Sequence, residues 1–218
     1  MENDFLTKLN FLKAHESGFI TDALRKLNLQ GWIDGVHPMQ NGASFIGEVF
    51  PVAYSDVAGD EKTYTLYETV DLCPPGSVLV MVGAHDKCVL GENVYTAAAN
   101  KGIAALVCEG RCRDGNAIRA GKMPMFCEGV KTRLPQPTLR ITRAGEPVIC
   151  QGARLCPGDV MMGDEDGVVY IPREHFDQVY DLVVKIAEIE EQCAKALKEK
   201  APVAEIGRLM KIKNSIGK

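Results

Sequence analysis

Residues 91–114 read GENVYTAAANKGIAALVCEGRCRD, and this stretch decides how the middle of the chain folds. Positions 93–100 hold good helix formers without a breaker, and Gly102 is a plausible C-terminal stop. The apolar run 103–108 is typical of a short, buried strand. The stretch therefore predicts a helix that leads directly into a strand.

The two ends of this stretch carry the chemistry. A helix that feeds a strand brings the far end of the strand back beside the helix start, so Arg113 and Asp114 are expected near Glu92, Asn93 and Val94. Free N–H groups at a helix start favour an anion, and a guanidinium can clamp the same carboxylate. The two acidic side chains offer hard oxygen ligands for Mg²⁺ or Mn²⁺. A structural ion pair at a strand end is the alternative interpretation.

The N-terminal part is predicted to be helical and the middle to be rich in strands. Residues 4–29 form two helical pieces, and Thr21 with Asp22 is expected to cap the second, over 23–29. Residues 60–69 are polar and carry no predicted element. The expected strands cover residues 44–55, 77–82, 123–127, 148–151, 160–162 and 167–172.

The C-terminal part is predicted to be helical as well. Residues 173–200 form a long amphipathic helix, Pro202 interrupts it, and 204–212 form a second, short helix. The pattern indicates an α/β chain with helices at both ends. We expect the whole chain to be a single domain, with a core of about 20–200 and a helical extension of about 201–218.

Composition excludes several classes of protein. The chain has 218 residues and a net charge of −4, which argues against a nucleic-acid binder. It has no long apolar run for a membrane span, and its polar start lacks the features of a signal peptide. A cytoplasmic location is expected. The eight cysteines are therefore expected to be free thiols, and the spacing of Cys108 and Cys112 is not enough for a zinc site.

An acidic run and a histidine are further candidates. The acidic run could be interpreted as a metal site, but we favour a structural role in the tight turn before a strand. It consists of Asp159, Asp164, Glu165 and Asp166. His85 lies in the loop before the helix of residues 93–100. It is either a base or substrate contact, or a surface residue.

Three motifs make the chain resemble a known family. They are PGSVLV at 75–80, the stretch 91–114 with its acidic residue 21 positions before Arg-Asp, and PGDVMMGDEDGVVYIP at 157–172. Together they resemble the family of 4-hydroxy-4-methyl-2-oxoglutarate/4-carboxy-4-hydroxy-2-oxoadipate aldolases and the regulator of ribonuclease activity A. The resemblance implies a layered β/β/α fold, swivelling-domain-like, and a homotrimer or homohexamer with sites at subunit interfaces.

The resemblance also implies how a substrate would bind. Backbone N–H groups of Asn93 and Val94, next to Gly91, would hold the carboxylate of a 2-oxo acid. Arg113 would bind substrate oxygens, and His85 is a further candidate contact. The loop around His85 and the presence of Glu109, where many members have Asp, are departures from the family pattern. They leave substrate identity open more than the type of reaction.

The implied reaction is that of a class II pyruvate aldolase that also decarboxylates oxaloacetate. Asp114 would hold Mg²⁺ or Mn²⁺ largely through water, and the ion and Arg113 would stabilise an enolate. Glu92 would be the acidic residue of the site. Glu191, from the long helix of a neighbouring subunit, is a candidate to accept the proton of the substrate hydroxyl. A non-catalytic regulator of a ribonuclease, or an enzyme acting on another acidic substrate, are the alternatives.

Overall fold

The helix and strand expected in the middle of the chain are both present in the computed structural model. Helix α4 (Glu92–Lys101) ends at Gly102, whose φ of 81° is left-handed. Glycine suits this conformation because it has no Cβ. The buried strand β6 (Ala105–Cys108) follows. The helix-to-strand prediction is therefore confirmed.

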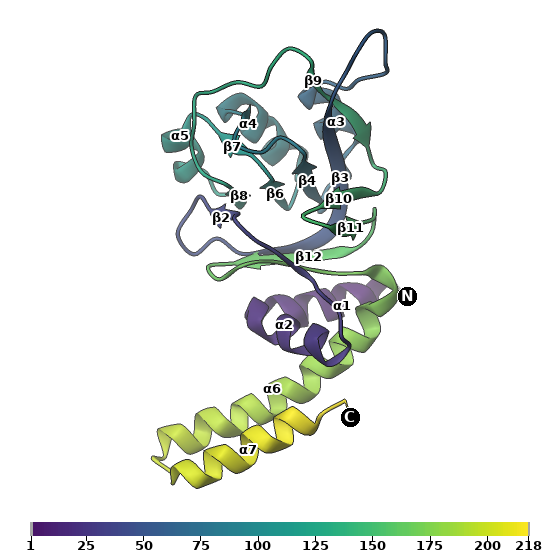
Figure 1. Cartoon of the computed structure of the whole chain (residues 1–218). Helices are drawn as coiled ribbons and strands as arrows, with labels where there is room; N and C mark the ends of the chain where they lie inside the picture. Colours follow the sequence, from purple (N-terminus) through teal and green to yellow (C-terminus); the bar gives the residue numbers. More distant parts are fainter. Residues whose placement is uncertain (1, 218) are drawn as a thin grey trace.

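Helices stand at both ends of the chain, as predicted, and others lie in its middle (Figure 1). The structure describes residues 2–217, so Met1 and Lys218, the outer bounds of the predicted domain, lie outside the described residues. Within residues 2–217, no helix has the length and apolar character needed to cross a bilayer. The helices are α1 (Glu2–Lys13), α2 (Ser17–Lys26), α3 (Leu66–Leu72), α4 (Glu92–Lys101), α5 (Gly115–Ala120), α6 (Phe176–Lys198) and α7 (Val203–Ser215).

The strands form a large mixed sheet and smaller strand pairs. They are β1 (Trp32–Ile33), β2 (His37–Pro38), β3 (Phe45–Asp56), β4 (Val78–Val82), β5 (Cys88–Leu90), β6 (Ala105–Cys108), β7 (Arg111–Cys112), β8 (Met125–Cys127), β9 (Leu139–Ala144), β10 (Val148–Cys150), β11 (Ala153–Leu155), β12 (Val160–Asp164) and β13 (Gly167–Ile171). The order across the large sheet is β1-β13-β12-β3-β4-β6-β8-β2, and β9 pairs with β3. Strands β3, β4, β6 and β8 are parallel, and the remaining neighbours are antiparallel.

Side chains alternate between two cores on the parallel part of the sheet. In β4, Leu79 and Met81 join the core that packs under α4. Val78, Val80 and Val82 join a second core on the opposite face. A period of two is what a strand buried on both faces requires, because successive side chains point to opposite sides. The parallel strands therefore form the middle of a sandwich.

The antiparallel part of the sheet closes the other side of the second core. Met161 and Tyr170 point into that core, whereas Met162 and Val169 pack against α1, α2 and α6. Figure 1 shows these helices below β12, and α4 and α5 at the upper end of the molecule. The predicted layered β/β/α fold, with N-terminal helices and a long C-terminal helix, is confirmed.

The predicted cap of the second N-terminal helix is wrong. Helix α2 begins at Ser17, and Thr21 lies inside it, where its hydroxyl donates to the Ser17 carbonyl at 3.2 Å. The helix start is stabilised from a distant strand instead. The Asp164 carboxylate accepts hydrogen bonds from the Ser17 N–H at 2.6 Å and the Ser17 hydroxyl at 2.9 Å. Such a long-range cap leaves no local pattern in the sequence.

The acidic run near β12 has structural roles, as favoured from the sequence. The buried Asp159 accepts from the N–H groups of Cys156 at 2.8 Å and Arg173 at 2.9 Å. Asp164 also accepts from the Asp166 N–H at 3.0 Å, inside the turn between β12 and β13. These carboxylates hold loops and a helix end in place.

Candidate functional site

A pair of very short strands positions the site. Strand β5 leads into the start of α4, and β7 leads into Arg113. The two strands are parallel, with Leu90 opposite Cys112, and the Arg113 N–H donates to the Leu90 carbonyl at 3.0 Å. Residues that follow two paired parallel strands lie side by side. Gly91 and Arg113 are therefore neighbours.

Arg113 and Asp114 pack directly over Gly91. A Cβ added to Gly91 would overlap Asp114 Oδ2 and lie 3.1 Å from Arg113 Nε. The Glu92 N–H donates to Asp114 Oδ2 at 3.0 Å, and Arg113 Nε lies 3.8 Å from the same oxygen. The structure thus brings the Arg-Asp pair to the first turn of α4, and the side chain that glycine lacks is what makes the close approach possible.

Polar groups at this point remain open to a ligand. The side chains of Arg113 and Asp114 are 54% and 46% exposed. Asp114 itself has a left-handed backbone, with φ of 58°. The N–H groups of Asn93 and Val94 lie in the first turn of α4, where no intrahelical acceptor exists for them. A small carboxylate can bind to these donors and to the guanidinium together.

A cavity of about 600 Å³ adjoins these groups. Gly91, Val94 and Arg113 form one end of it. The rest of the wall comes from β3, the segment around α3, strand β5, and residues within 134–141. The site therefore has a polar end that can bind an anion, and the larger part of the cavity lies beyond that end.

Asp114 is the residue that fits a divalent ion. Within residues 2–217, no group of three or more His, Cys, Asp or Glu side chains is poised to hold a metal. Mg²⁺ needs only one or two carboxylates, because it keeps several of its waters. Asp114 Oδ2 is engaged by the Glu92 N–H, while its half-exposed carboxylate leaves room for water-mediated ligation. The Glu92 side chain is exposed, and its contact with Asp114 is made by its backbone.

The structure places the other predicted site residues elsewhere in the chain. His85 lies in the loop after β4, with Nδ1 3.3 Å from Glu128 Oε1 and Nε2 3.5 Å from Glu109 Oε1. It is not among the residues that line the cavity at Arg113. Glu191 of α6 is not among the residues that line the cavity at Arg113, and it lines a different cavity together with Phe11 of α1 and Phe19 of α2. A role for Glu191 thus requires a second subunit.

Glu109 follows β6, and its carboxylate bonds to Gly83, which follows the parallel strand β4. It is buried, and its Oε2 accepts from the Gly83 N–H at 3.0 Å. In the part of the chain described, its Oε1 has no hydrogen-bond donor, although the exposed His85 ring approaches it. This carboxylate therefore orders the loop that carries His85.

The aromatic wall of the cavity was not predicted from the sequence. Tyr54, Tyr64 and Tyr67 line it, and so does Cys88. Burial raises the pKa of Tyr54 far above its ordinary value, and it raises the pKa of the Cys88 thiol, with Arg113 offsetting part of that rise. The phenol and the thiol are therefore neutral at pH 7, which disfavours a thiolate nucleophile here. The capping box that starts α3 was the sequence pattern that could have indicated part of this wall.

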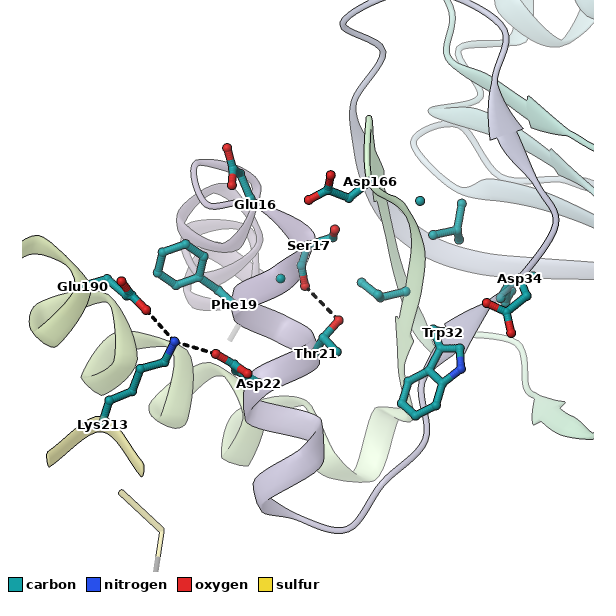
Figure 2. A pocket seen from close by; sticks show the side chains of 15 residues that line it. Glu16, Ser17, Phe19, Thr21, Asp22, Trp32, Asp34, Asp166, Glu190 and Lys213 are labelled. Carbon is teal, nitrogen blue, oxygen red and sulfur yellow. Dashed lines mark hydrogen bonds and ion pairs between the residues drawn. The ribbon is translucent and has the colours of Figure 1, made fainter. Parts of the chain in front are cut away.

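A separate cavity of about 600 Å³ lies on the opposite part of the molecule, between α2, β1 and the turn that joins β12 and β13 (Figure 2). Trp32 and several carboxylates line it. At its edge, Lys213 of α7 lies 2.6 Å from Asp22 and also pairs with Glu190. No residue of the Arg113 cavity contributes to it within the described chain, so the two cavities are distinct.

Comparison with known proteins gives one family. A family model described as RraA-like, Aldolase/RraA, matches residues 19–170. A predicted 4-hydroxy-4-methyl-2-oxoglutarate aldolase of Halalkalibacterium halodurans is 29% identical over 180 residues, which cover 82% of this chain and 81% of that protein. Protein DlpA of Legionella pneumophila is 28% identical over 189 residues, 83% of this chain but only 30% of DlpA.

Solved structures share the fold. A protein from Pseudomonas syringae pv. tomato aligns with a TM-score of 0.81 and 23% identity, over 92% of this chain and 96% of that one. Streptomyces coelicolor RraAS2, described as an unusual member of the RNase ES inhibitor RraA family, aligns with a TM-score of 0.75 and 24% identity, over 84% and 94%. At these identities the likeness shows the fold alone.

Proposed function

This chain belongs to the RraA-like (Aldolase/RraA) family, and from that membership and the geometry around Arg113 we propose that it is a carbon–carbon lyase. It releases pyruvate from a 4-hydroxy-2-oxo acid, depends on Mg²⁺ or Mn²⁺, and also decarboxylates oxaloacetate. The observation that carries the proposal is the packing of Arg113 and Asp114 over Gly91 at the start of α4. This arrangement supports the proposal because a guanidinium and free N–H groups, which can bind a small anion, lie beside a carboxylate, which can hold a cation.

The pyruvyl half of the substrate binds at the helix start. Its carboxylate accepts hydrogen bonds from the N–H groups of Asn93 and Val94. The Arg113 guanidinium donates to the 2-oxo oxygen. When the bond between C3 and C4 breaks, its electron pair moves onto that oxygen and gives the enolate of pyruvate. A fixed cation next to this oxygen stabilises the developing charge.

Asp114 is the residue that would hold the divalent ion, largely through water. The ion, when bound, would supply Lewis-acid stabilisation of negative charge on substrate oxygens. The Glu92 N–H bond to Asp114 Oδ2 fixes the orientation of that carboxylate. Glu92 also adds an exposed negative charge at the mouth of the site.

The substrate hydroxyl on C4 must lose its proton as its carbon becomes a carbonyl. Among the described residues, none that line the cavity at Arg113 is acidic, and the carboxylates beside its polar end are those of Glu92 and Asp114. Glu191 of a neighbouring copy is the proposed acceptor, acting through water, in a homotrimer or homohexamer with sites at subunit interfaces. The proton then returns to C3 of the enolate to give pyruvate.

A coupled assay with lactate dehydrogenase tests the proposal. Pyruvate should form from oxaloacetate and from a 4-hydroxy-2-oxo acid with Mg²⁺ or Mn²⁺, and a chelator should stop it. Arg113→Ala should lower kcat by about 100- to 1000-fold, because one charge-stabilising donor is lost. Arg143→Ala, an exposed arginine on β9, is the matched control. Absence of pyruvate from every substrate, together with capture of a ribonuclease at low salt, would favour a regulator instead.

A further inference from the structure

The cavity beyond Arg113 has a composition that defines what it accepts. Apart from the polar end at Gly91, its wall is mainly aromatic and aliphatic, with Tyr54, Tyr64, Leu134 and Leu139 among its residues. None of the residues that line it is acidic. At about 600 Å³ it is far larger than a pyruvyl group needs, since pockets for whole drug-sized ligands start at about 300 Å³.

Backbone and side-chain bonds hold the aromatic wall in place. The Tyr64 N–H donates to the Ile141 carbonyl at 2.8 Å, which ties this loop to β9. The next residue, Thr65, forms a capping box with Glu68, with bonds of 2.6 and 3.2 Å that fix the start of α3. Tyr67 follows inside this helix. The wall is therefore preformed and does not depend on a ligand to order it.

The outer end of the cavity is apolar and cationic. Tyr67 and Leu134 are 56% and 57% exposed, so much of their apolar surface is open to a ligand. Arg140 lines the same cavity and is exposed. A guanidinium can stack on an aromatic face as well as pair with an anion. An aromatic ring that extends from the pyruvyl end would meet tyrosine and leucine side chains, and the Arg140 guanidinium could stack on it.

We propose that the preferred substrates are 4-hydroxy-2-oxo acids that carry an aryl group on C4, with the ring in this aromatic cavity. The inference rests on the proposed lyase function and deepens it by naming the substrate class. A compact diacid would leave most of the apolar wall in contact with water, and beyond Arg113 the only cationic side chain among the described residues that line the cavity is that of Arg140. Burying an aromatic ring against this wall is favourable, because it removes apolar surface from water.

The activity test compares three substrates. Oxaloacetate reports on the pyruvyl end alone, 4-hydroxy-2-oxo-4-phenylbutanoate reports on the aryl cavity, and 4-hydroxy-4-methyl-2-oxoglutarate is the diacid. The aryl substrate should have a kcat/KM about tenfold or more above the diacid. Leu134→Asp should lower the ratio of aryl to oxaloacetate kcat/KM by about tenfold, because it adds a charge where the ring lies. Leu197→Asp, an equally exposed leucine on α6, should leave the ratio as it is.

A binding test separates this inference from the proposed function. Calorimetry with phenylpyruvate and with 2-oxoglutarate, in the presence of Mg²⁺, measures affinity without turnover. Phenylpyruvate should bind about tenfold more tightly, and Leu134→Asp should remove the difference. If oxaloacetate is decarboxylated but the diacid is the better aldol substrate and ligand, the aryl assignment is overturned while the lyase stands. If no substrate is cleaved, the lyase proposal fails, and the calorimetric order alone then supports or rejects the aryl cavity.

Discussion

At the scale of single residues, the site depends on the absence of a side chain at Gly91. Gly91 has an extended backbone with φ of −135°, which any residue adopts, so glycine is required there for space and not for conformation. The space is filled by Arg113 and Asp114. The glycine is therefore what allows two side chains to approach the start of the helix closely.

Replacement of Gly91 by alanine should disable the site while leaving the fold largely intact. The new Cβ would displace Asp114 Oδ2 and press on Arg113. Misplacement of catalytic groups by about 1 Å can cost about 100-fold in rate, and overpacking costs about 1–3 kcal/mol of stability. Pyruvate release and urea unfolding measure the two effects. Gly18→Ala, which would meet nothing within 4 Å, is the control and should keep full activity.

Asp86 should make the stability of the protein depend on acid pH. Its carboxylate accepts hydrogen bonds from Lys131 at 2.5 Å and Arg111 at 3.1 Å. These bonds lower the pKa of Asp86 from the ordinary 3.8, and the bond from Lys131 has the largest effect. A lowered pKa in the folded state contributes stability above the unfolded value of 3.8, and this contribution disappears as pH falls through the folded value. Asp86→Asn should thus be less stable than the native chain at pH 7.

Urea midpoints at several pH values check the Asp86 prediction. The gap between Asp86→Asn and the native chain should shrink as pH falls below about 4. Asparagine tolerates the left-handed φ of 55° at this position, so backbone strain does not confuse the comparison. A gap of the same size at pH 7 and pH 3 would show that the charge of Asp86 is not what stabilises the loops.

At the scale of elements, long-range contacts fix how the terminal helices sit. Helix α7 is attached by Lys213, whose side chain is only 16% exposed and pairs with Asp22 of α2 and Glu190 of α6. Lys26 of α2 donates to the Lys213 carbonyl at 2.8 Å in return. One lysine thus connects three helices.

Lys213→Met should loosen α7. Two carboxylates would lose their shared cation, at a cost of about 1–2 kcal/mol after allowance for solvent screening. Limited proteolysis should cut before or within α7 sooner than in the native chain, and Tm should fall. Lys211→Met, which removes an exposed lysine of the same helix, should change neither. Equal protease resistance of both variants would rule out this anchoring role.

The elements that the sequence predicted are those with a local pattern. Strands β4, β12 and β13 were recognisable as short apolar runs, and α6 was recognisable by its amphipathic pattern, because these signals lie within the element itself. Strands β5 and β7 are three and two residues long and are defined by their pairing with each other, and Cys112 of β7 also forms a bridge with Val130. A pattern that belongs to two distant segments is invisible in either one. Strand β9 was missed because it is rich in arginine and half exposed.

At the scale of the whole molecule, three hydrophobic cores pack against one sheet, and the eight cysteines, all within the described residues, are free thiols. Of the eight cysteines, seven are buried and Cys156 is of intermediate exposure. Burial raises the pKa of Cys73 and Cys150 to about 12. Most thiols are therefore both hidden and protonated at neutral pH.

Thiol titration tests this view of the cysteines. In the native protein a thiol reagent should modify about one group quickly, at Cys156, and the remainder only as the protein opens. In guanidinium chloride all eight should react. Cys156→Ser should abolish the fast phase. Rapid reaction of several thiols in the native Cys156→Ser protein would contradict the described burial.

The candidate site was predictable at its polar end and not at its apolar end. The order of helix and strand was enough to bring Arg113 and Asp114 back to Glu92, although the pairing of β5 with β7 does the positioning. The aromatic wall comes from three separate segments that no periodicity connects. The reach of Glu191 depends on how copies assemble, which no pattern within one chain specifies.

The left-handed backbone at Asp114 links the stability of the protein to the chemistry of the site. At its φ of 58°, Asp114 carries a backbone strain of about 1 kcal/mol or less, and glycine at this position would be free of that strain. Asp114→Gly would relieve this strain but lose the hydrogen bond from the Glu92 N–H, so its heat resistance would reflect two opposing effects, and the variant would have no carboxylate to offer an ion. Directed evolution of this scaffold should therefore select for turnover as well as endurance, because selection for endurance alone does not protect the carboxylate at position 114.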